Sequence, residues 1–358
     1  MSVPSRPDLS QVPPEVRAYI EHLEAQLAPR SRNASAREPE SAEPPERPTT
    51  AQVIVLSRQG LAKRTPRHLY HRQRRGGLGA FDLECSPPDE PAHILVAHRE
   101  QRLFLLSNRQ RAFVLAVADL PERPARSARG APLADLLPLQ DGEAVAVALP
   151  LVEEATYLYL LSQEGWVRRV AGHQVSRLAH GALLEIRPGH LPVAGCWGDG
   201  QGDLFVATTG GLAVRFQERK VPLRGGCLAL RLTGTDRACG IAPVQEEDMV
   251  LLMAADGRGT LRRMAGFRPH KSPGARGKVA MKTQHLVGVQ RAQPGQDVFV
   301  LSSLSKGIRF PVDEIPPKEG AVQGVQCMAL RNDRVVAFAL SQAGEPLLQE
   351  EGQEVARP

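Results

Sequence analysis

The stretch that decides the fold is VIVLSRQGLAKR at residues 53–64, because the same pattern returns five more times along the chain. Each copy has an apolar run, a polar turn and a second run that carries cations, which is the pattern of a β-hairpin. The other copies are LFLLSNRQRAFV (103–114), LYLLSQEGWVRR (158–169), LFVATTGGLAVR (204–215), LLMAADGRGTLRR (251–263) and VFVLSSLSKGIRF (298–310).

The turns of these hairpins recur every 46 to 55 residues when they are aligned on Gly60, Gln110, Gly165, Gly211, Gly259 and Ser305. Four of the six are glycine, as a tight turn with positive φ would require. A period of this length built of strands indicates propeller blades or an array of β units. We therefore predict an all-β, six-bladed β-propeller over residues 53–343.

Composition restricts the class of protein further. The 358 residues are 42% hydrophobic, which excludes wholesale disorder, and the 32 Gly and 30 Pro favour short elements with many turns. The five cysteines are far apart and odd in number, so neither a zinc site nor a disulfide framework is expected. No run of 18 apolar residues is present, and we expect a soluble, cytoplasmic protein without a membrane partner.

The two ends of the chain differ from the repeats. Residues 1–28 contain an apolar stripe (Val16, Ile20, Leu23, Leu27) and predict a short helix that either pairs with a partner helix or stands exposed to solvent. Residues 29–52 are rich in Pro, Ser, Glu and Arg and predict a flexible linker, and residues 344–358 predict an acidic tail. The tail either competes for a basic surface or is simply a soluble end.

Charge is concentrated in the repeats. The whole chain has a formal charge of +6, but residues 53–343 contain 38 Lys or Arg against 27 Asp or Glu. An acidic partner is therefore expected.

Arginines recur in register within the hairpins. Four positions after each aligned turn residue the chain has Arg64, Val114, Arg169, Arg215, Arg263 and Arg309. In a ring of similar blades these positions would form a ring of guanidinium groups suited to a polyanion. The alternative is that each arginine only solvates the end of an exposed strand.

The strongest local motif is Gln73-Arg74-Arg75-Gly76-Gly77-Leu78-Gly79, which ends a basic run from Val53 to Phe81 that has no acidic residue. Glycines allow backbone N–H groups to approach a phosphate, and arginines beside them add further donors. Lys63 belongs to the same run. The alternative is a flexible basic loop without a fixed partner.

This motif resembles the gyrase box of the C-terminal domain of DNA gyrase A, with Leu78 where the family usually has lysine. The segment from Arg126 to Glu143 is similar to the family's blade-connecting segment, and Arg129-Gly130, Arg224-Gly225 and Arg276-Gly277 are similar to its R-G loops. The resemblance implies a β-pinwheel that exchanges strands between blades and wraps duplex DNA. Gln110, Val114 and the short loop at His180 depart from the pattern in blades two and three.

We accordingly predict a protein that binds and bends double-stranded DNA on a basic rim without base specificity, in association with the nucleoid. The predicted DNA-binding residues are Lys63, Arg64, Gln73, Arg74, Arg75, Gly76, Gly77, Gly79, Arg129, Arg169, Arg215, Arg263, Arg276 and Arg309. The alternative is an accessory subunit that docks on a gyrase or topoisomerase IV core through the N-terminal helix.

Catalysis is not expected. The chain shows no P-loop, no acidic metal triad and no nucleophile with a placed base, so we predict no catalytic residue, metal or cofactor. Only 52 residues precede the first repeat, and the resemblance implies that a breakage-reunion region is missing.

Overall fold

The computed structural model describes residues 46–341. These residues belong to the second of two compact units, Pro45–Pro358. The predicted helix at 1–28, most of the predicted linker and the acidic tail at 344–358 lie outside the described residues and stay predictions. The linker boundary at residue 52 was wrong, because the first strand begins at Ala51 and Thr49, Ala51 and Gln52 are buried in the folded unit.

The six repeats form six antiparallel hairpins, as predicted. Their strands are β1 (Ala51–Ser57) and β2 (Leu61–Pro66), β5 (Arg102–Ser107) and β6 (Arg111–Ala116), β9 (Tyr157–Ser162) and β10 (Trp166–Ala171), β13 (Asp203–Thr208) and β14 (Leu212–Gln217), β18 (Met249–Ala254) and β19 (Arg258–Arg263), and β23 (Asp297–Ser302) and β24 (Lys306–Pro311).

A hydroxyl closes most of the hairpin turns. Five of the first strands end in Ser or Thr, whose Oγ accepts the backbone N–H four residues later, as from Leu61 to Ser57 at 2.9 Å. The turn residue itself has positive φ, and in the fifth hairpin this residue is Gly257 (φ 82°). The alignment on Gly259 was therefore wrong by two residues, because Asp256-Gly257 makes the turn and Gly259 already lies in β19.

Each hairpin gains an inner strand and a short outer strand. The inner strands are β4 (Pro91–His98), β8 (Val145–Pro150), β12 (Pro192–Gly198), β17 (Ala238–Val244), β22 (Leu286–Ala292) and β27 (Val335–Leu340). The outer strands are β3 (Ala80–Phe81), β7 (Ala131–Pro132), β11 (Ala182–Leu183), β15 (Cys227–Leu228), β21 (Lys278–Val279) and β26 (Val325–Gln326).

The outer strands are exchanged between neighbouring blades. The first sheet has the order β4-β1-β2-β7, so its outer strand comes from the connection that follows the second hairpin. The same shift continues around the ring, until β3 from the first connection completes the last sheet, β27-β23-β24-β3. The ring is thus closed by pairing between the two ends of the folded unit.

The remaining elements belong to the connections. One-turn helices follow the hairpins, namely η1 (Arg67–Leu69), η2 (Val117–Asp119), α2 (Gly172–Val175), η4 (Glu218–Lys220), η5 (Met264–Gly266) and η6 (Val312–Glu314). A further one-turn helix and three short strands complete the connections: η3 (Leu133–Asp135), β16 (Leu230–Arg231), β20 (Ala275–Arg276) and β25 (Pro317–Lys318).

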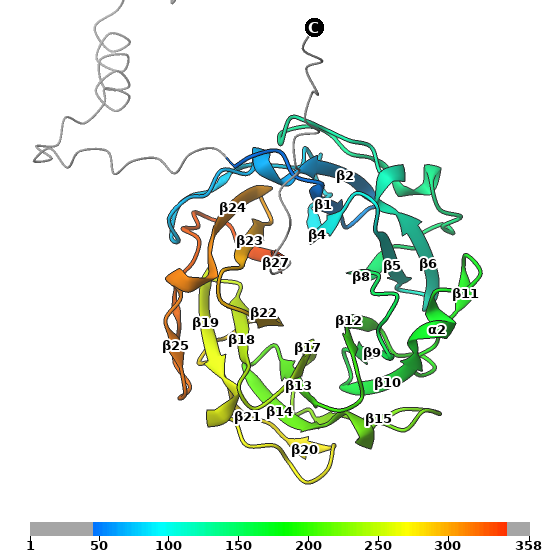
Figure 1. The fold of residues 1–358 in the computed structure, drawn as a ribbon, viewed down its shortest axis with the longest axis vertical. Coiled ribbons are helices and arrows are strands. Elements are labelled where there is room, and N and C mark those ends of the chain that lie inside the picture. Colours follow the sequence, from blue (N-terminus) through cyan, green and yellow to red (C-terminus); the bar gives the residue numbers. More distant parts are fainter. Residues whose placement is uncertain (1–45, 342–358) are drawn as a thin grey trace, which may run out of the picture. The chain divides into compact units, whose positions relative to one another are not determined.

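The folded unit forms a ring in which the inner strands border the centre and β11, β15 and β25 lie at the periphery (Figure 1). Each inner strand contacts the next, and β27 contacts β4. A cavity of about 380 Å³ lined by all six inner strands lies between them. Every inner strand also bulges by one residue at the same register point: Ala92, Ala146, Val193, Cys239, Val287 and Val336.

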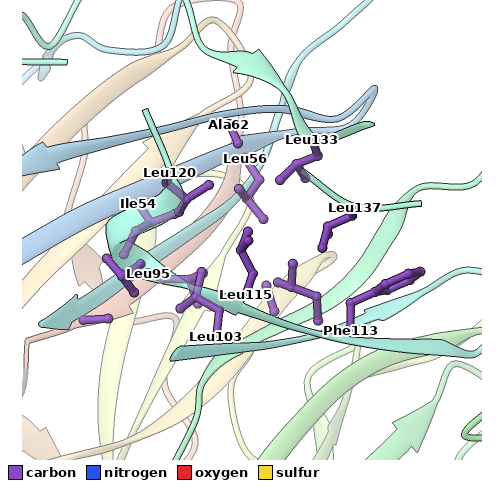
Figure 2. Close-up of a cluster of buried hydrophobic side chains, with 14 residues drawn as sticks. Ile54, Leu56, Ala62, Leu95, Leu103, Phe113, Leu115, Leu120, Leu133 and Leu137 are labelled. Atoms are coloured by element: carbon purple, nitrogen blue, oxygen red, sulfur yellow. The ribbon is translucent and has the colours of Figure 1, made fainter. Parts of the chain in front are cut away.

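The apolar core is divided into six clusters, one at each junction between blades. Successive side chains of a strand point to opposite faces of its sheet, so alternate residues reach different neighbours. Ile54 and Leu56 face the second blade and pack with Leu103 and Phe113 (Figure 2), whereas Val53 packs toward the sixth blade. No blade has a core of its own, which is why the repeats must assemble to fold.

Burial raises the pKa of the Cys85 and Cys227 thiols from about 9 to about 11. At pH 8 the reactive thiolate fraction of both is then about a hundredfold lower than that of an ordinary thiol. We predict that native protein is alkylated by iodoacetamide at pH 8 about a hundredfold more slowly at these sites than unfolded protein, with rates that rise with pH up to about 11. Peptide mass spectrometry over a pH series measures this, and rapid labelling of native Cys85 at pH 8 would contradict it.

Candidate nucleic-acid interface

Three of the arginines in register face the junctions between blades. Arg64, Arg215 and Arg309 are only 5%, 3% and 4% exposed, so the structure contradicts their predicted place on an open rim. At these three positions the regular spacing reflects a structural contact that is repeated at three junctions.

Arg309 shows the contact most completely. Its Nε donates to Asp297 at 2.8 Å, and its Nη1 donates to the carbonyl oxygens of Tyr70 (3.1 Å) and Arg67 (3.3 Å) and pairs with Glu46. Helix η1 of the first blade begins at Arg67 and is followed by Tyr70, so the guanidinium of Arg309 joins the last blade to the first. The same carboxylate of Glu46 also pairs with Arg67. Burial alone would raise the pKa of Glu46, but the two arginines that face the carboxylate lower this pKa overall.

Arg215 and Arg64 repeat this arrangement at other junctions. Arg215 Nη1 donates to the Met264 and Phe267 carbonyls at 2.8 and 3.3 Å, around η5 of the next blade. Arg64 Nε donates to the Leu120 carbonyl at 2.9 Å, directly after η2. Each of these arginines therefore fixes the one-turn helix of the following blade.

The other positions of the predicted ring differ. Arg169 is half-buried and its guanidinium lies 4.6 Å from the centre of the Tyr157 ring. With the fifth turn corrected to Gly257, the equivalent residue there is Leu261, and Arg263 is an exposed side chain two positions later. Arg263 therefore does not belong to the ring to which the sequence assigned it.

Lys63 is fully buried and cannot contact a ligand on the surface. Its Nζ lies 2.6 Å from Asp82 Oδ1, and Asp82 also accepts the Tyr70 hydroxyl at 3.1 Å. Burial lowers the pKa of Lys63, although Asp82 opposes this shift. The prediction that Lys63 binds DNA was wrong, because burial of a charge is tolerated here only through its internal pair.

The box motif fastens the first blade to the last one. Gly76 N donates to the Cys327 carbonyl at 2.7 Å, and Gln73 N donates to the Arg309 carbonyl at 2.8 Å. Gly79 has positive φ and lies so close to β24 that a Cβ atom there would be 2.9 Å from the Gly307 carbonyl oxygen. The N–H of Gly77 donates to the Arg74 carbonyl at 3.3 Å. The N–H groups of Gly76 and Gly77 are thus used within the fold and not offered to a phosphate.

The two arginines of the box have different environments. Arg75 is half-buried, and its Nε donates to the Glu314 carbonyl and its Nη1 to the Gln326 carbonyl, at 2.9 and 3.3 Å. Arg74 is exposed. Of the box, Arg74 is the side chain best placed to meet a partner from solution.

The basic charge lies on six peripheral segments, which we call the outer segments. Each runs from the end of a one-turn helix through the outer strand that follows it: 70–81, 120–132, 176–183, 221–228, 267–279 and 315–326. Together they contain 13 Lys or Arg and 2 Asp or Glu, whereas the rest of residues 53–343 has 25 of each. The whole excess of +11 in the repeat region therefore belongs to the outer segments.

Ten of these cations are exposed, among them Arg74, Arg129 and Arg276, which the sequence predicted. Sequence reasoning missed the others, which are Arg72, Arg177, Arg224, Arg268, Lys271, Lys278 and Lys318. A count of charged residues along the connections between hairpins, instead of at equivalent positions within the hairpins, would have identified them. The segment 267–279 is the most basic, with four cations and no acid.

Three further findings concern the described region. Within residues 46–341 no group of three or more His, Cys, Asp and Glu side chains is arranged to hold a metal ion. No helix in the same range is long and apolar enough to cross a bilayer. The five cysteines are all free thiols.

Comparison with known proteins agrees with this architecture. A family model described as DNA gyrase C-terminal domain, beta-propeller, matches residues 51–79 and 296–342, which are the two parts that meet where the ring closes. A solved structure of the DNA gyrase A C-terminal domain superposes with a TM-score of 0.73 at 20% identity, covering 82% of this chain and all of that one. The ring shares the β-propeller fold of that domain.

The chain is also similar in sequence to DNA gyrase A proteins. The chain is 27% identical over 311 residues to the DNA gyrase A protein of Salmonella typhimurium and 26% identical over 349 residues to that of Pseudomonas aeruginosa. These matches cover 84% and 82% of this chain but only 35% and 38% of the relatives. The C-terminal domain of a DNA topoisomerase IV shares the fold with a TM-score of 0.58 at 18% identity, over 82% of this chain and 94% of that one.

Proposed function

We propose that this gyrase A-type propeller binds double-stranded DNA around its periphery and bends it. The observation that supports this most is the confinement of the net positive charge to the outer segments, while the rest of the repeat region is neutral. A cationic circumference complements a curved polyanion. The role needs no catalytic group, and binding to chromosomal DNA would place the protein at the nucleoid.

Contacts between exposed cations and duplex DNA go to the phosphates and do not depend on base sequence. The exposed cations of Arg74, Arg129, Arg224 and Arg276 lie on different outer segments, so DNA that contacts several of them must follow the ring. Bending a site of 20 to 30 base pairs costs on the order of 1–6 kcal/mol, which many charged contacts can offset.

Measurement of DNA affinity against salt concentration tests the binding itself. With about six phosphates neutralised, log K should fall against log salt with a slope of roughly −5, and unrelated duplex sequences should bind alike. A slope near zero, or a strong preference for one sequence, would overturn the proposal.

The bending can be tested through DNA topology. We predict that relaxed circular DNA, incubated with the protein and a nicking-closing enzyme and then deproteinised, is left supercoiled. The resemblance to the gyrase A domain implies that the duplex wraps along a chiral path, and a chiral path stores writhe. The Arg74→Gln/Arg129→Gln/Arg276→Gln variant should leave fewer supercoils at the same protein concentration. Unchanged topoisomers with the unaltered protein would contradict wrapping, although binding would be left standing.

The alternative hypothesis, an accessory subunit that docks on a gyrase or topoisomerase IV core, depends on residues 1–28. Deletion of these residues should then abolish co-purification with gyrase subunits while DNA affinity is kept.

A further inference from the structure

The outer strands carry a second repeated feature besides charge. Each is preceded by a glycine, in the order Gly79, Gly130, Gly181, Gly226, Gly277 and Gly324. At Gly130 a Cβ atom would be 2.7 Å from the Ala62 carbonyl oxygen, so a glycine there allows the strand to approach its neighbour. The glycines therefore fix the register of all six outer strands.

Because the register is fixed, the second residue of each outer strand occupies an equivalent place on the periphery. These residues are Phe81, Pro132, Leu183, Leu228, Val279 and Gln326, and five of the six are apolar. All are at least partly exposed, and Phe81, Leu183 and Val279 are 48%, 66% and 47% exposed. We call these six residues the apolar ring.

Scattered surface leucines need no explanation, but these residues are not scattered. Nine large apolar side chains of the described region are exposed, and five lie in the outer segments, which make up less than a quarter of it. Besides the three just named, these are Leu78 in the box and Leu223 beside Arg224. Apolar exposure that recurs at one equivalent place on several blades favours a surface that a partner covers.

The cations of the same segments indicate which partner. Lys278 directly precedes Val279 in β21, Arg276 is three residues before Val279, and Arg129 is three residues before Pro132. A surface that alternates cations with apolar groups matches a nucleic-acid backbone, in which charged phosphates alternate with apolar deoxyribose faces. An apolar protein surface would leave the exposed cations of these strands without a counterpart, whereas duplex DNA offers both phosphates and apolar sugar faces.

We propose that the apolar ring packs against the deoxyribose faces of bound duplex DNA while the neighbouring cations contact its phosphates. This inference rests on the proposed DNA binding and extends it. Affinity then has two parts, a charged part that salt weakens and an apolar part that salt leaves unchanged.

The two parts separate in a plot of log K against log salt. The variant Phe81→Thr/Leu183→Thr/Val279→Thr keeps residues suited to strands and changes no charge. We expect its affinity to be roughly tenfold lower at every salt concentration, with an unchanged slope, because apolar area is no longer buried. The control Val152→Thr/Leu191→Thr/Leu304→Thr alters side chains outside the outer segments that are 44–54% exposed, and it should bind like the unaltered protein.

The outcomes are distinct. Binding by the triple variant within twofold of the unaltered protein, or a parallel loss in the control, would overturn the apolar contact and leave the proposed function standing. A lack of DNA binding by the unaltered protein would overturn both. Leu183→Thr alone, expected to weaken binding about twofold at every salt concentration, repeats the test with the least structural disturbance.

Discussion

Replacing Arg309 with methionine is expected to destabilise the protein strongly while the salt dependence of DNA binding by the folded fraction stays the same. Methionine keeps most of the side-chain volume of arginine but has none of the hydrogen-bond donors of the guanidinium group. Asp297, which is only 3% exposed, then keeps Arg72 as a partner but loses two hydrogen bonds, and the Tyr70 and Arg67 carbonyls lose theirs. Breaking a buried pair in this way costs about 3 kcal/mol.

The loss should be visible as a lower midpoint of thermal and denaturant unfolding, by several degrees in temperature. Arg263→Met is the matched control, since it removes the same group from an exposed position that the sequence also assigned to the ring. We expect its stability to be within about 0.5 kcal/mol of the unaltered protein. If Arg309→Met instead left stability unchanged and reduced the salt slope by about one, the arginines in register would belong to the DNA surface after all.

This experiment also bears on what the sequence could predict. The six hairpins followed from the pattern alone, because alternation of apolar residues and a recurring turn are local properties. The place of Arg309 is not local, since it depends on Asp297 across the hairpin and on the η1 carbonyls of the first blade, more than two hundred residues away. Arginines that recur at equivalent positions of the repeats fit a ligand-binding surface and a structural contact equally well until their hydrogen-bond partners are known.

The box shows a similar limit. Glycines beside arginines are typical of a phosphate loop, and the sequence does not show that Cys327 and Arg309 supply the acceptors for Gly76 and Gln73. By contrast, Arg129 and Arg276 were predicted to bind DNA from R-G loops, and both are exposed. Each directly precedes the glycine before an outer strand, and Arg276 ends the short strand β20. Their role toward DNA stays a prediction.

Removing the cations of the outer segment 267–279 is expected to produce the largest loss of DNA affinity. In the variant Arg268→Gln/Lys271→Gln/Arg276→Gln/Lys278→Gln, four exposed cations with no acid in the same segment become neutral. If all four contact phosphates, the salt slope should become less steep by roughly 3.6, and affinity at moderate salt should fall by about two to three orders of magnitude. Thermal stability should change little, because these side chains are exposed.

The matched control is Arg99→Gln/Arg109→Gln/Arg237→Gln/Arg258→Gln, which alters the net charge by the same amount at positions outside the outer segments. Long-range attraction depends on net charge and is shared by both variants, whereas counterion release depends on the phosphates actually contacted. The control should therefore weaken binding only slightly and keep the slope. Equal losses in the two variants would mean that DNA is attracted by overall charge and has no fixed path along the periphery, and the proposal of bending around the ring would fail with that result.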